Sequence, residues 1–145
     1  MPVALLSVLI FATALRQWRC AVVSLVLLMN WTINTSFVQL SGDNYPWLVF
    51  ATVDYCAAMI LIPITRSWQR IVPLTYALEL LMHVAYGISN KGLHEQYYYW
   101  WSLDYTAWGQ ICFVALWIGH DGIVGAFDRF WSVSDRSLVS KGSRE

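Results

Sequence analysis

The stretch RIVPLTYALELLMHVAYGISN, residues 70–90, decides the fold, because it is apolar enough to span a bilayer and yet carries Glu79 and His83. At 100° per residue, the polar side chains of such a helix share one face: Tyr76, Glu79, His83, Tyr86 and Asn90. Apolar side chains occupy the opposite face: Leu74, Leu78, Leu81, Ala85 and Ile88. Hydrocarbon cannot satisfy hydrogen-bonding groups, so we expect the polar face to point into a helix bundle or a wetted cavity.

The composition of the chain indicates a membrane protein. Of its 145 residues, 58% are hydrophobic and 12% are charged, and the mean hydropathy is +0.49, whereas soluble domains carry about 25% charged residues. The nine Lys and Arg are spread along the chain and the net charge is +0, which leaves no basic footprint for nucleic acid. The expected fold class is an all-α, polytopic transmembrane helix bundle with short loops, embedded in the lipid bilayer.

Apolar segments predict four or five spans. The segment 2–15 rises only ~21 Å as a helix, short of a ~30 Å hydrocarbon core, so the chain has five spans if this segment crosses and four if it lies along the interface. Four longer segments follow it: 20–40, 45–64, 70–90 and 97–127. We expect residues 1–131 to form the bundle and residues 132–145 to form a polar, frayed tail.

Basic residues mark every second connection between these spans. The turns 16–19 (RQWR) and 66–70 (RSWQR) carry two arginines each, the turn 41–44 (SGDN) carries none, and the loop 90–96 (NKGLHEQ) carries only Lys91. Cytoplasmic loops of membrane proteins are enriched in Lys and Arg. We therefore predict that both arginine-rich turns and the C-terminus are cytoplasmic.

Two carboxyl groups lie inside the predicted spans at matched depth. Asp54 is near the middle of its span, and Glu79 is about eight residues into the helix that follows. If they meet across the hairpin, repulsion and desolvation favour a shared proton, or else His83 or a cation neutralises the pair. One interpretation is a proton or cation pathway that Gln110 and Tyr76 also line. The other is a buried hydrogen-bonded lock between helices.

The positions of the histidines do not identify a cofactor. We expect His83 to pair with Glu79 one turn before it, with a proton relay and a metal ligand as alternatives. A metal centre of Asp54, Glu79 and His83 is chemically acceptable, but the chain lacks the repeated Glu-x-x-His pairs of helix-bundle metal sites. His83 and His120 lie at different depths, which argues against paired haem ligation. We expect His120 and Asp121 to form a polar pair near the inner side.

Three further features favour structural roles. The three cysteines lie in separate apolar segments without CxxC spacing, so we expect small core side chains rather than a disulfide or a zinc site. Asn30 and Asn34 are one turn apart and are expected to present amides to a neighbouring helix. The run YYYWW at 97–101 is expected to anchor the bundle at headgroup level.

These features leave three classes of function. We favour a small ion or proton pathway, a channel-like bundle lined by Asp54, Glu79, His83 and Gln110 that assembles as a homo-oligomer or with another membrane protein. The first alternative is a holin-like pore-forming or accessory membrane protein of phage or bacterial type. The second is an intramembrane metal-dependent enzyme, which ranks last because we find no serine or cysteine nucleophile with a base at helical spacing.

Overall fold

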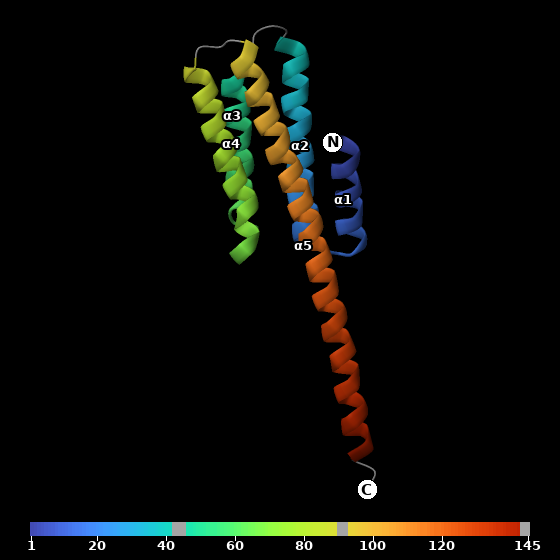
Figure 1. The fold of residues 1–145 in the computed structure, drawn as a ribbon. Helices are drawn as coiled ribbons and strands as arrows, with labels where there is room; N and C mark the ends of the chain where they lie inside the picture. The colour runs from blue at the N-terminus through green and yellow to red at the C-terminus, as the bar shows by residue number, and fades with distance from the viewer. Residues whose placement is uncertain (42–45, 90–92, 143–145) are drawn as a thin grey trace.

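In the part of the chain that the computed structural model describes, five α-helices and one short 3-10 helix form the fold (Figure 1). That part comprises the backbone of residues 1–41, 46–89 and 93–142, and its side chains outside 93–95 and 126–142. The elements are α1 (Pro2–Ala14), α2 (Trp18–Ser41), α3 (Trp47–Leu61), η1 (Ser67–Arg70), α4 (Ile71–Ile88) and α5 (Leu93–Gly142). Every one of these elements is helical, which confirms the all-α fold class.

Prolines and tight turns set the helix boundaries. Pro2 lies in the first turn of α1, where its missing N–H removes no bond because the first N–H groups of a helix lack helical partners. The helix α3 ends at Leu61, just before Pro63, as the sequence predicts. Two residues at the turns, Arg16 with φ 56° and Ser67 with φ 50°, adopt the left-handed region, which L-residues occupy only where the surrounding structure requires it.

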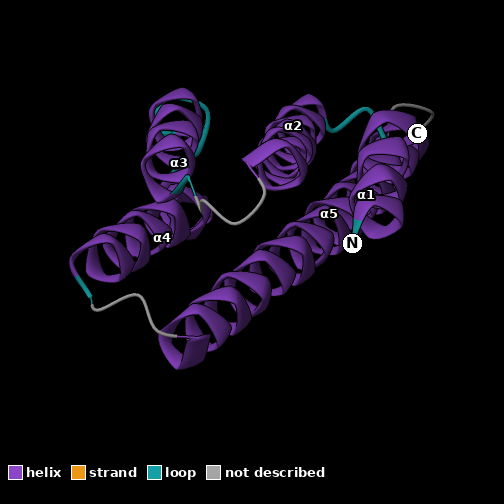
Figure 2. Ribbon diagram, turned by 90° about the horizontal axis from the view of Figure 1, so that it is seen from above, coloured by secondary structure: helices purple, strands orange, loops and turns teal. Residues whose placement is uncertain are grey.

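The helices run up and down and close into a ring. α1 packs on α2, α2 on α3, α3 on α4 and α4 on α5, and α5 in turn contacts α1 and α2. Viewed from above, the five α-helices surround a shared interior (Figure 2). α1 accompanies only the part of α2 near the α1–α2 turn, so the far part of α2 has no α1 beside it (Figure 1).

The helix α5 is longer than the sequence suggests. The last span is expected to end near residue 127, yet α5 continues as one helix to Gly142 and extends past the bundle (Figure 1). The chain has no proline after Pro73, so nothing in this segment breaks a helix strongly. The division into a bundle and a polar tail at residue 131 stays a prediction, since the side chains there lie outside the described residues.

The burial of α4 confirms the two faces expected from its sequence. On the polar face Tyr76, Glu79, His83 and Tyr86 are each at most 6% exposed. On the apolar face the exposed fractions lie between 48% and 81% for Leu74, Leu78, Leu81 and Ile88. Asn90, expected at the end of the polar face, lies outside the described residues. The polar face of α4 therefore points into the bundle.

The interior of the bundle has two halves of different character. The half nearest the α1–α2 turn and η1, here called the packed half, is filled by apolar side chains from all five α-helices, which include Ala12, Cys20, Val23, Leu61, Val72, Val114, Trp117 and Ile118. The other half, here called the cavity half, contains the buried polar side chains of Asp54, Glu79, His83 and Gln110. Close packing thus holds one half together, and hydrogen bonds are concentrated in the other.

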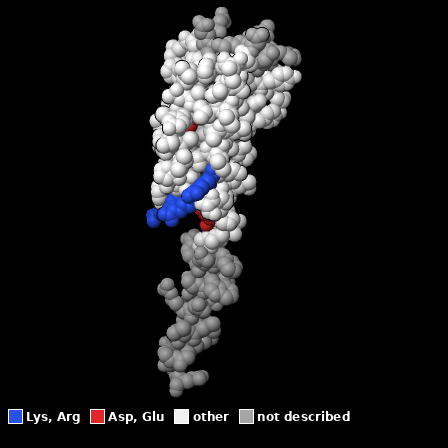
Figure 3. All heavy atoms as spheres, turned by 90° about the vertical axis from the view of Figure 1, so that its left-hand side faces the viewer, with Lys and Arg blue, Asp and Glu red and all other residues white. Residues whose placement is uncertain are grey.

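Much of the described surface is apolar. On the face shown in Figure 3, the described Lys and Arg side chains gather at one end of the bundle. Large apolar side chains are exposed on every α-helix, up to 83% for Leu40 on α2. The described arginines, Arg16, Arg19, Arg66 and Arg70, belong to the two turns at the packed-half end. By the same alternation of basic residues, the loops 41–44 and 90–96 are predicted to lie on the opposite side of the membrane, but residues 42–44 and 90–92 of these loops lie outside the described residues.

Two helical segments are long and apolar enough to cross a membrane, Trp18–Ser41 and Ser67–Ile88. Pro2–Ala14 and Trp47–Leu61 are apolar but shorter. Length and composition therefore support a membrane location for two segments, and the number of four or five spans stays a prediction.

Candidate functional site

A cavity of about 220 Å³ lies in the cavity half and receives side chains from all five α-helices. The helices α2 to α5 supply its polar lining, which consists of Asn30, Asn34, Thr35, Asp54, Tyr76, Glu79, His83, Asp104 and Gln110. Leu5, Leu27 and Ile111 border both the cavity and the packed half. At ~30 Å³ of liquid per molecule, the cavity has room for about seven waters.

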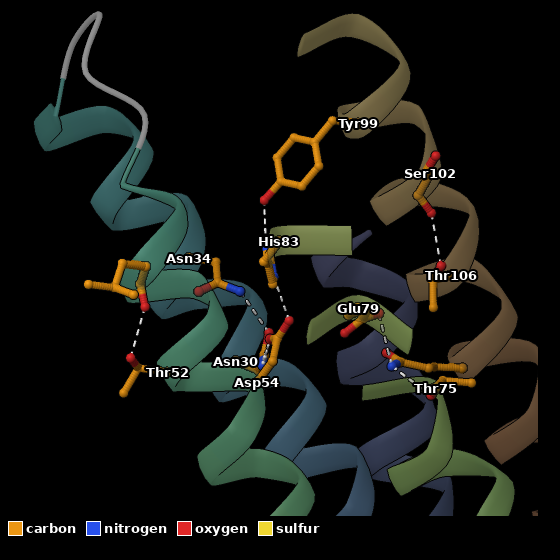
Figure 4. A network of polar contacts seen from close by, with 12 residues as sticks. Asn30, Asn34, Thr52, Asp54, Thr75, Glu79, His83, Tyr99, Ser102 and Thr106 are labelled. Atoms are coloured by element: carbon orange, nitrogen blue, oxygen red, sulfur yellow. Dashed lines mark hydrogen bonds and ion pairs between the residues drawn. The ribbon is translucent and has the colours of Figure 1, made fainter. Parts of the chain in front are cut away.

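A chain of hydrogen bonds crosses three helices at one wall of the cavity (Figure 4). His83 on α4 contacts Asp54 on α3, with 2.7 Å between Nε2 and Oδ2, and its Nδ1 bonds the hydroxyl of Tyr99 on α5. In neutral histidine, Nε2–H donates to the Asp54 carboxylate and Nδ1 accepts from the Tyr99 hydroxyl. Because all three side chains are at most 6% exposed, this chain is made away from bulk water.

Two asparagines on α2 extend this chain of hydrogen bonds. The amide of Asn30 donates to Asp54 Oδ1 at 2.7 Å, and the amide of Asn34 donates to Asn30 Oδ1 at 3.0 Å. The expected interhelical bond of Asn30 is therefore confirmed, whereas the bond that the Asn34 amide donates stays within its own helix. The Oδ1 atom of Asn34 is buried, and no described residue donates a hydrogen bond to it. It is an unsatisfied acceptor on a residue that lines the cavity.

Glu79 belongs to a second group of bonds, between α4 and α5 (Figure 4). The amide of Gln110 donates to Glu79 Oε1 at 3.1 Å and to Thr75 Oγ1 at 2.9 Å. Tyr76 also lines the cavity, and its buried hydroxyl has no hydrogen-bond partner in the described part of the chain. Among the described side chains, the close contacts between a basic and an acidic group are His83 with Asp54 and His120 with Asp121, so Glu79 takes part in none of them.

Asp54 and Glu79 both line the cavity, so the fold brings their two carboxyl groups to one place. Two ionised carboxylates at short range repel each other strongly where water is scarce. A single proton held by the pair removes this repulsion. The two groups of hydrogen bonds therefore meet at a place that can hold an exchangeable proton or a cation.

Two sequence-based expectations at this site are wrong. His83 does not pair with Glu79, since both of its ring nitrogens bond to other helices. Tyr99 is not a surface anchor, because it is 6% exposed and stacks on Tyr86 with 4.2 Å between the ring centroids. The uniform run of aromatic residues at 97–101 carried no signal that could have distinguished Tyr99 from its neighbours.

The pair of His120 and Asp121 forms away from the cavity, at the packed-half end. His120 Nδ1 is 3.1 Å from Asp121 Oδ1, and the side chains are 60% and 41% exposed. Trp117 donates its indole N–H to Asp121 Oδ2 at 2.7 Å, and the Trp68 ring lies 5.6 Å from the His120 ring. The ring contact joins α5 to η1, whereas the two hydrogen bonds lie within α5. None of these contacts takes part in the buried site.

The described residues include no group of three His, Cys, Asp or Glu side chains placed to hold one metal ion. The suggested ligands Asp54, Glu79 and His83 do line one cavity, but each is engaged in hydrogen bonds. Of the cysteines, Cys20 is buried, while Cys56 and Cys112 are exposed. The expectation of a core position is therefore wrong for these two, which lie on outward faces of α3 and α5.

No protein-family model, curated protein or solved structure matches this chain. The site must be interpreted from its own chemistry. An imidazole whose Nδ1 accepts a hydrogen bond from one partner and whose Nε2–H donates a hydrogen bond to another can take up a proton at Nδ1 and release one at Nε2. The arrangement of Tyr99, His83 and Asp54 has this form, and Glu79 supplies a second carboxyl group beside it.

Proposed function

We propose that the chain is an integral membrane protein whose bundle crosses the bilayer with its packed-half end in the cytoplasm. The exposed apolar side chains on every α-helix support this, because soluble proteins rarely expose such continuous apolar surface. The arginines at the packed-half end supply the orientation. α2, α3, α4 and the first part of α5 would span, and α1, which rises about 20 Å, would enter only part of the bilayer.

The function that we propose is a proton pathway, or more broadly a cation pathway, through the cavity half. One observation carries the proposal: the chain from Tyr99 through His83 to Asp54 ends beside Glu79 in a cavity with room for water. Ionisable groups inside a membrane are costly and commonly mark ion or proton routes. A purely structural lock would require neither a cavity of this size nor a second carboxyl group.

The packed half limits how such a pathway can work. Between Gln110 and the packed-half end, the described interior is mainly apolar, with fully buried side chains such as Leu61, Val114 and Trp117. Its buried hydroxyl groups, those of Ser24 and Thr65, bond to backbone carbonyls one turn earlier in the chain. The cavity is therefore a binding chamber on one side of an apolar barrier. Transfer across the membrane requires a second arrangement of the packed half, or a contact between copies of the chain.

Proteoliposomes provide the test. Purified protein is reconstituted with an internal pH dye, and a proton gradient is imposed together with a potassium-valinomycin shunt. The proposal expects acidification of the lumen without release of a trapped large dye such as carboxyfluorescein. Replacement of Asp54 by Asn should slow the acidification. The matched control is Asp121→Asn, which makes the same change outside the cavity and should leave the rate unchanged.

Two results would contradict the pathway. Release of carboxyfluorescein at the same protein density would favour the holin-like alternative, in which the protein forms a large pore. Equal proton flux in Asp54→Asn and wild type would show that protons do not pass through the buried polar residues of the cavity.

The orientation has its own test, in a background in which the three cysteines are replaced by alanine. Single cysteines at positions 67 and 140, in place of Ser67 and Ser140, are labelled from outside intact cells with a membrane-impermeant maleimide. Both sites should stay unlabelled until the cells are opened, because both are predicted to be cytoplasmic. Efficient labelling of either site in intact cells would overturn the orientation.

A further inference from the structure

We propose that the cavity binds a small organic ammonium ion that carries N–H donors. This inference rests on the proposed cation role of the cavity and names the class of cation. Three carboxyl groups line the cavity, those of Asp54, Glu79 and Asp104, and the residues that line it include no lysine or arginine. The lining also includes Met1, which carries the N-terminal amino group, so three acidic groups share it with two bases, this amino group and the imidazole of His83.

Aromatic rings form a second part of the lining. Trp31, Phe50, Tyr76 and Trp100 come from four different helices and all border the cavity. The face of an aromatic ring attracts ammonium groups, most strongly where water is excluded. A cavity that combines aromatic rings with carboxyl groups suits an organic cation with an apolar part better than a bare, strongly hydrated metal ion.

The unsatisfied groups indicate which hydrogen bonds a ligand would make. Tyr76 is 1% exposed, and its hydroxyl has no hydrogen-bond partner among the described residues. The Oδ1 atom of Asn34 is a buried acceptor that likewise lacks a donor. Buried polar groups are rarely left without partners, so each of them is evidence of an occupant. Together with the carboxyl oxygens, they call for a ligand that donates several N–H bonds.

The cavity has an opening that would admit such a ligand. Its deep lining is buried, whereas Trp31, Thr35 and Val38 on α2 and Leu103 on α5 are half-buried, and Asp104 on α5 is exposed. The mouth therefore lies between α2 and α5, in the region that α1 leaves uncovered (Figure 1). Asp104 would be the first carboxylate that an entering cation meets.

The experiment measures binding to the purified full chain in detergent by isothermal titration calorimetry. The probes are n-propylammonium chloride and 1-propanol, which has the same number of heavy atoms and no charge. Potassium chloride at equal ionic strength serves as the salt control. A ligand with so few atoms is expected to bind with a Kd on the order of 1 mM. The proposal expects saturable binding of n-propylammonium and none of 1-propanol.

Variants separate a specific site from weak charge attraction. Glu79→Gln should weaken n-propylammonium binding at least about tenfold. Asp104→Asn, at the exposed mouth, should weaken it without affecting the fold. Tyr76→Phe should weaken binding while the ligand-free protein becomes no less stable, because the change removes an unsatisfied buried hydroxyl. Asp121→Asn is the matched control and should bind as wild type does.

Equal binding of the two probes, no saturable binding, or wild-type affinity in Glu79→Gln would each overturn this inference. Proton flux without ammonium binding would also overturn this inference but would leave the proposed proton pathway standing. Ammonium binding without flux would instead support the site and contradict the pathway.

Discussion

The packed half and the cavity half are built from the same five α-helices but use them differently. In the packed half, Leu61, Val114 and Trp117 are at most 1% exposed and fill the interior. In the cavity half, the same helices surround about 220 Å³ of space, and hydrogen bonds between helices join His83 to Asp54 and Gln110 to Glu79 at its lining. In membranes, helix association depends on close packing and on interhelical hydrogen bonds that are individually weak. The difference indicates that the packed half supplies most of the stability and that the cavity half is available for function.

The largest effect should come from a cavity introduced into the packed half. Leu61 is 0% exposed, and Leu61→Ala should lower the free energy of unfolding by about 2 kcal/mol or more. Leu78, on the outer face of α4, is 48% exposed, and Leu78→Ala should change it by less than about 0.5 kcal/mol. Titration with dodecyl sulfate in mixed micelles measures both. Similar losses in the two variants would contradict the assignment of stability to the packed half.

The next effect concerns the close contact at the far end of the cavity half. A Cβ atom at Gly87 would lie 2.7 Å from the ring of Trp47, so Gly87→Ala must displace that ring. We expect a loss of about 1 kcal/mol or more from this overpacking. Gly109 has open space around it, and Gly109→Ala should be neutral or stabilise α5 by up to about 1 kcal/mol. The same micelle titration measures the free energy of unfolding of both variants. If neither Gly87→Ala nor Gly109→Ala differed from wild type, the close contact between Gly87 and Trp47 would be contradicted.

The smallest effect should come from a single hydrogen bond of the cavity half. Tyr99→Phe removes the hydroxyl that bonds His83 and should cost about 0.6 kcal/mol, the mean for such bonds in a membrane bundle. Tyr105 is 65% exposed, and Tyr105→Phe is the control with no expected change. If Tyr99→Phe destabilised the bundle as much as Leu61→Ala, the distinction between the halves would fail.

The faces of the helices could be predicted from the sequence because they depend only on the helical repeat. The polar face of α4, from Tyr76 to Tyr86, follows from 100° per residue, and its burial agrees. The matched depth of Asp54 and Glu79 follows from counting residues along a hairpin. Pro63 likewise marks the end of α3.

The partners of each side chain could not be predicted in this way, since they depend on how the helices are rotated against each other. A local pair of His83 with Glu79 is consistent with the repeat, yet the packing of α3 and α5 turns both ring nitrogens toward Asp54 and Tyr99. The helical repeat also says nothing about the space left between packed helices, so the cavity could not be predicted from the sequence. The polar composition after residue 127 predicts a frayed tail, yet α5 continues to Gly142, because polar side chains alone do not end a helix and the segment has no proline.

Stability and proton flux, measured together in Glu79→Gln, decide whether Glu79 belongs to a proton pathway or only locks the helices together. Glutamine can still accept the bond from Gln110 but cannot carry a proton, so unfolding should stay within about 0.6 kcal/mol of wild type while proton flux is lost. Glu79→Leu should be less stable than Glu79→Gln, because it leaves the amide of Gln110 without this acceptor. A folded Glu79→Gln protein with no flux is the predicted result. Full flux in that protein would make Glu79 a structural lock and would contradict the pathway.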